Sequence, residues 1–211
     1  VAVPAVRAQD DVEATPSPAD TGALSTPEEM DAVRALGPDT SVRARERAQA
    51  VLRKNPNSFV AYIVLGLVED QNEGNFPRAV FYLEKALSLY ESKYGKEPVP
   101  AVWKWYSLLL RSLADAHGNL SHHQKKIDFI DRYNKLFDPD MIAERAWPLM
   151  QLGRYEDARK AAALAMQTGL TDQRSAALNA ICATEFEAGH ILASYDACQK
   201  ALEDGRERPG G

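Results

Sequence analysis

Apolar residues recur at helical spacing along most of this chain. Between residues 26 and 203 the larger apolar side chains stand three, four or seven positions apart, and short polar stretches with Gly or Pro separate the runs. This spacing gives a helix one apolar stripe, whereas a half-buried strand needs strict alternation. β-branched residues are sparse, and Ala, Leu, Glu, Lys and Arg are plentiful. The pattern therefore predicts an all-α protein.

Start and stop signals divide the runs into ten predicted helices. The clearest start is Ser25-Thr26-Pro27-Glu28-Glu29, which combines a hydroxyl cap, a proline at the first helical position and early glutamates. The other signals are glycines and prolines after the last turn of a run. The helices are predicted to start near Pro27, Ser41, Ser58, Pro77, Pro100, Ser121 and Thr171, with a pair on either side of Gly153 and a last helix from Ile191.

The helices are expected to form pairs that repeat along the chain. Gly153-Arg-Tyr-Glu-Asp-Ala158 is a tight turn followed at once by a helix start. Similar turns are predicted at Gly74, Gly118 and Gly189, so that the four glycines are 44, 35 and 36 residues apart. A period in this range with two helices per unit is typical of a helical solenoid. Gly66 lies inside a predicted helix, where it costs about 1 kcal/mol relative to Ala, so a neighbouring helix should pack closely against it.

Three of these units resemble the tetratricopeptide repeat (TPR) family, whose 34-residue unit is a helix pair. The matching residues are Tyr62, Leu65, Gly66, Ala79, Leu83 and Ala86; Ala146, Leu149, Gly153, Tyr155, Ala158 and Ala165; and Leu178, Ile181, Cys182, Gly189, Ile191, Ser194, Cys198 and Ala201. The unit from Pro100 departs from the pattern, with a longer turn and Ile127 in place of a small residue, and its lead-in from Tyr94 resembles the longer repeats of kinesin light chains. The resemblance implies a right-handed superhelical α-solenoid of about five antiparallel pairs over residues 26–203.

The chain divides into three predicted segments. Residues 25–204 form the repeat domain, and 205–211 form a flexible tail. Residues 1–24 are interpreted as a signal-peptide remnant and a disordered linker, because Val6-Arg7-Ala8 approximates a small-x-small cleavage site. We therefore expect an extracytoplasmic protein, in a bacterial periplasm. The alternatives are a segment boundary within a flexible N-terminus and a cytoplasmic location.

Composition and motifs narrow the classes of function. The net charge is −5, which disfavours a nucleic-acid surface, and no apolar run reaches the length of a membrane span. The sequence has no nucleophile elbow, no phosphate-binding glycine loop and no His-Glu-x-x-His motif, so we predict neither an enzyme nor a cofactor. His117, His122 and His123 gather at one predicted turn, but adjacent histidines in a loop are more often solvated than metal-bound.

The resemblance implies that the first helix of each pair lines a concave groove that holds a partner peptide or helix. By position in the repeat, the groove residues are Ile63, Leu67, Asp70, Lys104, Leu108, Arg111, Trp147, Met150, Asn179 and Phe186. Trp147 is a candidate anchor for a partner, and the alternative is that it packs against the adjacent repeat. Lys104 and Arg111 either receive a carboxylate of the partner or form a solvated face.

Cys182 and Cys198 are the only cysteines. Their positions in the repeat pattern place them opposite each other across the last helix pair. In an exported chain they would form a disulfide that closes a loop of about 16 residues and contributes about 3 kcal/mol. The alternative is two buried thiols that fill positions for small residues.

Together these features predict a non-enzymatic protein–protein interaction scaffold, acting as a subunit or assembly factor of a cell-envelope complex. The alternative is a regulatory or substrate-recruiting TPR domain of a longer enzyme. A third possibility is self-association through Trp103, Trp105 and neighbouring aromatic residues.

Overall fold

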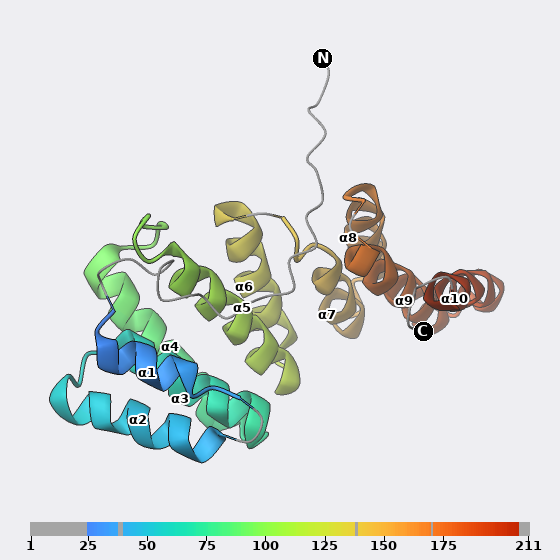
Figure 1. Ribbon diagram of the computed structural model, residues 1–211. Helices are drawn as coiled ribbons and strands as arrows, with labels where there is room; N and C mark the ends of the chain where they lie inside the picture. The colour runs from blue at the N-terminus through green and yellow to red at the C-terminus, as the bar shows by residue number, and fades with distance from the viewer. Residues whose placement is uncertain (1–24, 38–39, 138, 170, 207–211) are drawn as a thin grey trace.

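A computed structural model describes residues 25–37, 40–137, 139–169 and 171–206. These residues form helices and connecting turns, and no strand occurs among them. Successive helices lie antiparallel to each other along an elongated, curved array (Figure 1). The protein is therefore all-α, a right-handed superhelical α-solenoid, as the sequence predicts. The predicted signal remnant and linker of residues 1–24 lie outside the described residues.

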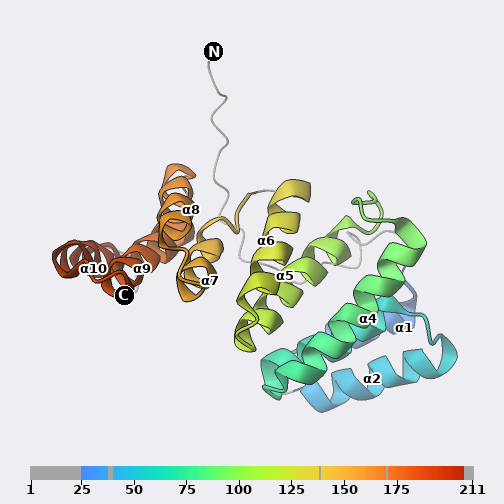
Figure 2. The ribbon, with the colours of Figure 1, turned by 180° about the vertical axis from the view of Figure 1, so that it is seen from behind.

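Five helix pairs make up the described array. They are α1 (Pro27–Arg34) with α2 (Ser41–Lys54), α3 (Phe59–Leu67) with α4 (Phe76–Tyr94), α5 (Trp103–Asn119) with α6 (His123–Leu136), α7 (Ala146–Gln151) with α8 (Tyr155–Gln167), and α9 (Thr171–Glu187) with α10 (Ile191–Arg206). A π-helical turn, η2 (Val68–Asn72), extends α3, and a 3-10 turn, η3 (Ala143–Arg145), leads into α7. The first helix of each pair also packs against the second helix of the preceding pair, which joins the pairs into one array (Figure 2).

The predicted start of α1 is confirmed. The Glu29 backbone N–H donates to the Thr26 hydroxyl at 3.2 Å, and the Thr26 N–H donates to the Glu29 carboxylate at 2.7 Å, which completes a capping box. The Ser58 hydroxyl caps α3 through the Ala61 N–H and also donates to the buried Glu29 carboxylate. One carboxylate therefore links the starts of α1 and α3.

Three of the four predicted turn glycines have the backbone that the prediction requires. The φ angles of Gly74, Gly153 and Gly189 are 63°, 71° and 78°, in the left-handed region that glycine adopts at little cost. The prediction for Gly118 is wrong. This glycine lies inside α5, which continues to Asn119, and Ser121 makes the left-handed turn with a φ of 57°.

Gly66 has the packing role that its position predicts. A Cβ atom built on Gly66 would lie 2.6 Å from Cγ of Leu83, a residue of α4. Only a residue without a side chain lets α3 and α4 approach this closely. The predicted close approach is therefore confirmed.

Buried apolar residues form two separate clusters. The first runs through α1 to α6 and contains large side chains, including Trp105 and the stacked rings of Tyr90 and Tyr106, whose centroids are 4.4 Å apart. The second joins Ile127 of α6 to η3, α7, α8 and α9. It is built mostly of alanines, which are Ala143, Ala146, Ala158, Ala161, Ala162, Ala165, Ala177 and Ala180. The core of the N-terminal half of the array is therefore built from large side chains, and the core of the C-terminal half mostly from small ones.

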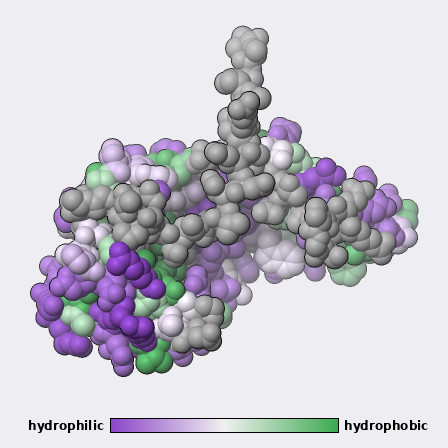
Figure 3. Space-filling view, viewed as in Figure 1, coloured by the Kyte–Doolittle hydropathy of each residue, from purple (hydrophilic) through white to green (hydrophobic). Residues whose placement is uncertain are grey.

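Two remaining features concern the surface and the ends. Charged and polar residues dominate the visible surface over α1 and α2 (Figure 3). Helix α10 continues to Arg206, two residues into the segment predicted as a tail. Among the described helices, none combines the length and apolarity that crossing a bilayer requires.

Candidate functional site

Three of the predicted groove residues lie in the core. Ile63 is fully buried, and Leu67 and Met150 are 5% and 4% exposed. Helix α3 is apolar on every side and packs against α1, α2, α4 and α5, so all of its residues except Tyr62 are buried. Met150 joins the second core cluster beside Leu149. These residues stabilise the array and are not available to a partner in this structure.

The predicted pair of cations does not form an open anion site. Arg111 donates to the Asp140 carboxylate at 3.1 Å and to the Tyr133 hydroxyl at 3.3 Å, and its guanidinium lies 5.4 Å from the centre of the Tyr133 ring. Lys104 lies 5.8 Å from the Trp103 ring centre. Because Asp140 already pairs with Arg111, an incoming carboxylate would have to displace it.

Trp147 lies at the surface of α7 and remains 52% exposed. It borders a hollow of about 570 Å³ formed by the end of α5, the start of α6 and α7. The side chains that matter here are Asp115, Asn119, Lys126, Trp147, Pro148 and Gln151. The indole is therefore open to a ligand instead of being buried against the next helix pair.

Charges of both signs meet around this hollow. The Lys126 ammonium lies 3.5 Å from the Glu144 carboxylate and 3.9 Å from that of Asp115. Desolvation by the surrounding protein, with a contribution from Glu144, raises the pKa of Asp115 to about 6. Asp70, which accepts a hydrogen bond from Asn119 at 3.3 Å, also has a raised pKa because of desolvation. Lys126 thus lies near two carboxylates, those of Asp115 and Glu144, and of these Asp115 lines the hollow itself.

This arrangement suits a positively charged group from outside. A lysine or arginine side chain can place its charge against an indole face while a carboxylate pairs with it. The Asp115 carboxylate, at a pKa near 6, would be stabilised in its charged form by such a cation. Because the Lys126 ammonium already lies 3.9 Å from the Asp115 carboxylate, a basic side chain held next to Trp147 would have to share or displace that contact.

Sequence reasoning found Trp147 in the hollow, and Asp70, which lies outside the lining and bonds Asn119, but missed Asp115, Lys126 and Glu144. These three come from α5, α6 and η3, and no spacing along the sequence brings them together. The other predicted groove residues do not line this hollow: Leu108 is half-buried, Asn179 is exposed, and Phe186 lies near the end of α9 with 62% of its surface exposed.

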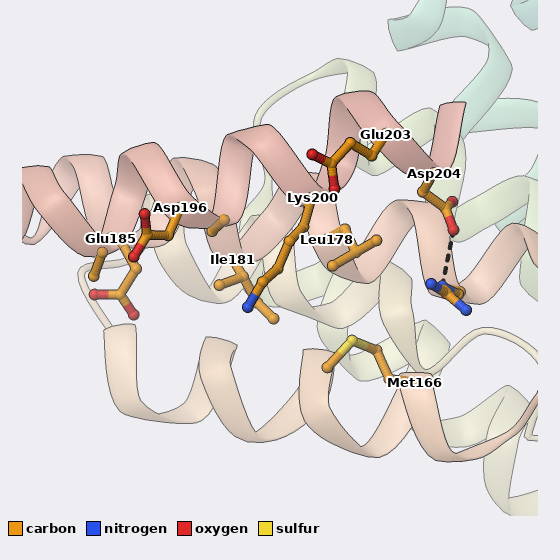
Figure 4. A pocket seen from close by; sticks show the side chains of 11 residues that line it. Met166, Leu178, Ile181, Glu185, Asp196, Lys200, Glu203 and Asp204 are labelled. Carbon is orange, nitrogen blue, oxygen red and sulfur yellow. Dashed lines mark ion pairs between the residues drawn. The ribbon is translucent and has the colours of Figure 1, made fainter. Parts of the chain in front are cut away.

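A second hollow of about 680 Å³ lies where α8, α9 and α10 meet (Figure 4). In this view Lys200 extends from α10 towards α8 and overlaps Ile181 of α9, and Leu178 of α9 and Met166 of α8 also border the hollow. Arg174 and Asp204 form an ion pair of 2.8 Å at one end. Nothing in the sequence pattern predicted this hollow, because its sides come from three helices of two pairs.

Cys182 and Cys198 are joined by a disulfide, with Cα atoms 4.8 Å apart. The bridge links the middle of α9 to the middle of α10. The nearby Ser194 hydroxyl donates to the Cys182 carbonyl at 3.1 Å, which adds a second tie between the same two helices. These are the two residues that the repeat pattern placed opposite each other.

The histidines near the α5–α6 turn are held by other side chains. His117 is fully buried, its ring stacks on Phe129 with centroids 5.5 Å apart, and its Nδ1 lies 3.2 Å from Nδ1 of His122. Burial lowers the pKa of His117. Its Nε2 lies 3.4 Å from the Glu84 carboxylate. These contacts give His117 a structural role at the turn.

Comparisons with known proteins bear on the fold. A scan against protein-family models found no match, and a search of curated proteins found no relative. Among solved structures, the crystal structure of MamA, a TPR-type protein, superposes with a TM-score of 0.63 at 16% sequence identity, over 87% of this chain and 97% of that chain. At this identity the likeness shows the fold alone, which is a TPR-like helical repeat.

Proposed function

We propose that this chain is a non-enzymatic protein-interaction scaffold of the TPR type, and that the hollow beside Trp147 holds part of the partner. The observation that carries the proposal is the half-exposed indole of Trp147 next to the desolvated carboxylate of Asp115. Large aromatic side chains at the edge of a hollow are the usual anchors of protein interfaces. The repeat architecture supports it, since helical repeats present extended surfaces to other chains.

The partner segment that fits best is an extended peptide with a basic side chain. Its cation would lie between Trp147 and Asp115, and Asn119 and Gln151 at the border of the hollow offer side-chain amides to the peptide backbone. Binding a cation lowers the pKa of Asp115, so the affinity should increase as the pH rises through about 6.

The location of the protein belongs to the same proposal. A disulfide between Cys182 and Cys198 is typical of an oxidising compartment, and this supports the extracytoplasmic location expected from the N-terminal sequence. A scaffold in that compartment would act as a subunit or assembly factor of an envelope complex. Fractionation of cells that carry the full gene, with the thiols of Cys182 and Cys198 trapped by an alkylating reagent, tests the location.

Selection from a library of displayed random peptides tests the binding function. The selected peptides should be enriched in Lys or Arg, and their affinity should fall by about 30-fold or more for Trp147→Ala and for Asp115→Asn, measured by fluorescence anisotropy. Trp147→Ala should melt close to the wild-type temperature because the side chain is half exposed.

Trp105→Ala is the matched stability control. Trp105 is 1% exposed in the first core cluster, so its removal should cost about 3–5 kcal/mol of folding free energy. Peptides that bind Trp147→Ala as tightly as the wild type would show that this hollow is not the binding site. A large loss of stability for Trp147→Ala would instead assign the indole to packing.

A further inference from the structure

The outer side of α10 carries a stripe of exposed apolar residues. Leu192, Tyr195 and Leu202 are 84%, 62% and 58% exposed, and Ile191 at the start of the helix is 61% exposed. The opposite side of α10 packs on α9 through Ser194 and Ala197, which are buried. An apolar stripe of this size on a surface helix marks a place where another chain binds.

We propose that this stripe is a homodimer interface, on which α10 of a second copy packs antiparallel about a two-fold axis. The interface is separate from the hollow beside Trp147, so it does not depend on the proposed function. Three observations favour a second copy over other occupants: the position of Leu192, the spacing of the stripe and the charge of the opposite end of the array.

The position of Leu192 argues against simple continuation of the array. One repeat earlier, 36 residues back, the counterparts of Tyr195 and Leu202 in α8 are Arg159 and Met166, which face the next pair: Arg159 bonds Glu185 of α9, and Met166 lines the hollow shared with α9 and α10. The counterpart of Leu192 is Glu156, whose side chain is 79% exposed. A helix placed on α10 in the way that α9 is placed on α8 would therefore leave Leu192 in water, whereas a partner helix centred on the stripe would cover it.

The spacing of the stripe is the same in both directions. Residues 192, 195, 199 and 202 are separated by steps of three, four and three, with leucine at each end. In an antiparallel pair, Leu192 of one copy lies level with Leu202 of the other, and Tyr195 lies level with Gln199. Within one chain the Gln199 amide already donates to the Tyr195 hydroxyl at 2.9 Å, so the polar group in the middle is satisfied.

The opposite end of the array is a poor match for the stripe. The exposed residues of α1 and α2 are mostly charged, and include Glu28, Asp31, Arg43, Glu46 and Arg53 (Figure 3). A head-to-tail arrangement would bury these charges against leucines. A two-fold arrangement instead joins two apolar surfaces along helices of 16 residues, about 24 Å.

Sedimentation velocity across the micromolar range tests the dimer, with one chain of 23.3 kDa as the monomer reference. The wild-type chain should sediment as a dimer at the higher concentrations. Leu192→Glu and Leu202→Glu should each raise the dissociation constant by about 100-fold, because each change occurs twice in the dimer. The control is Val42→Glu, at a residue of the opposite end that is 61% exposed, and it should leave dimerisation unchanged.

Cross-linking tests the orientation, with both native cysteines left in their bridge. Chains with Leu192→Cys mixed with chains with Leu202→Cys should form a covalent dimer under mild oxidation. Leu192→Cys alone should not, since position 192 of one copy would lie about 15 Å from position 192 of the other. A wild-type chain that stays monomeric, or a dimer that Leu192→Glu leaves intact, would overturn the proposal. Efficient cross-linking of Leu192→Cys alone would overturn the antiparallel register.

Discussion

Lys126 of α6 lies across Gly118 of α5, and a Cβ atom on Gly118 would come within 2.9 Å of the Lys126 Cδ atom. The absence of a side chain at Gly118 lets the lysine stem approach the helix, and its ammonium then reaches Asp115 and Glu144. Gly118, which the sequence pattern predicts as a turn residue, therefore positions Lys126 in the hollow beside Trp147.

The substitution Gly118→Ala should change the position of Lys126 without lowering the stability of the protein. Alanine favours the helix by about 1 kcal/mol, and the flexible Lys126 side chain can move aside, so stability should be equal or slightly higher. The displaced ammonium no longer favours the charged form of Asp115, so the pKa of that carboxyl should rise further above 6. Carboxyl NMR titration measures the pKa, and an unchanged value would show that Lys126 does not depend on Gly118.

Gly66→Ala should have the opposite effect on stability. Its Cβ atom would lie 2.6 Å from Leu83, which is fully buried and cannot move without disturbing the core. Overpacking of this kind costs about 1–3 kcal/mol, more than the gain in helix propensity. Urea unfolding of this variant beside Gly118→Ala gives a matched comparison of two helical glycines. Equal stability of the two variants would mean that α3 and α4 can separate at no cost.

The Cys182–Cys198 bridge should make the last helix pair sensitive to reductant. Thiol titration in denaturant without reductant should find no free thiol. Reduction should lower the unfolding free energy by about 3 kcal/mol, the value for a loop of this length. The double variant Cys182→Ala with Cys198→Ala is the control, because reductant should not change its stability. Two titratable thiols in the protein as isolated would contradict the bridge.

Glu185 should make acid stability depend on one ion pair between α8 and α9. The Arg159 guanidinium, which donates to the carboxylate at 3.0 Å, and His190 lower the pKa of Glu185 to about 2. Because the pKa of Glu185 is depressed in the folded protein, its ion pair contributes fully to the folding stability above pH 4.5, the ordinary pKa of this carboxyl. The contribution is lost as the pH falls towards 2.

Glu185→Gln should therefore destabilise the protein by about 2 kcal/mol at neutral pH and flatten the acid limb of its stability curve. Urea unfolding at several pH values between 2 and 7 measures both effects. Glu156→Gln is the comparison, since Glu156 also bonds Arg159 but is 79% exposed and should contribute little. A similar loss for both variants would mean that burial of Glu185 adds nothing.

The fold could be predicted from the sequence because local features determine it. Thr26 with Glu29, Gly153 and Gly189 each act within one helix or one turn, and Gly66 acts between two helices that are adjacent in the sequence. Gly118 shows the limit of this reasoning. The same residue type at nearly the same spacing lies inside a helix, because Ser121 takes the turn instead.

The site could be predicted only in part. Position in a repeat indicates which side of a helix faces the groove, but it does not reveal what else packs there, and α3 is enclosed so that Ile63 and Leu67 become core. Trp147 could be predicted because its residue type and its position in the repeat can both be read directly from the sequence. The hollow beside Trp147 was missed, because the charged side chains in and around it come together only after α5, α6 and η3 have packed.

The hollow beside Trp147 lies at the seam between the two clusters of buried residues. Asp115 belongs to α5, most of whose buried residues are in the first cluster, and Trp147 belongs to α7, which is packed into the second. A peptide bound across this seam gains its full contact energy only while both blocks are folded. Occupancy would thus couple the stability of the two clusters, because the bound peptide loses contacts when either of them unfolds.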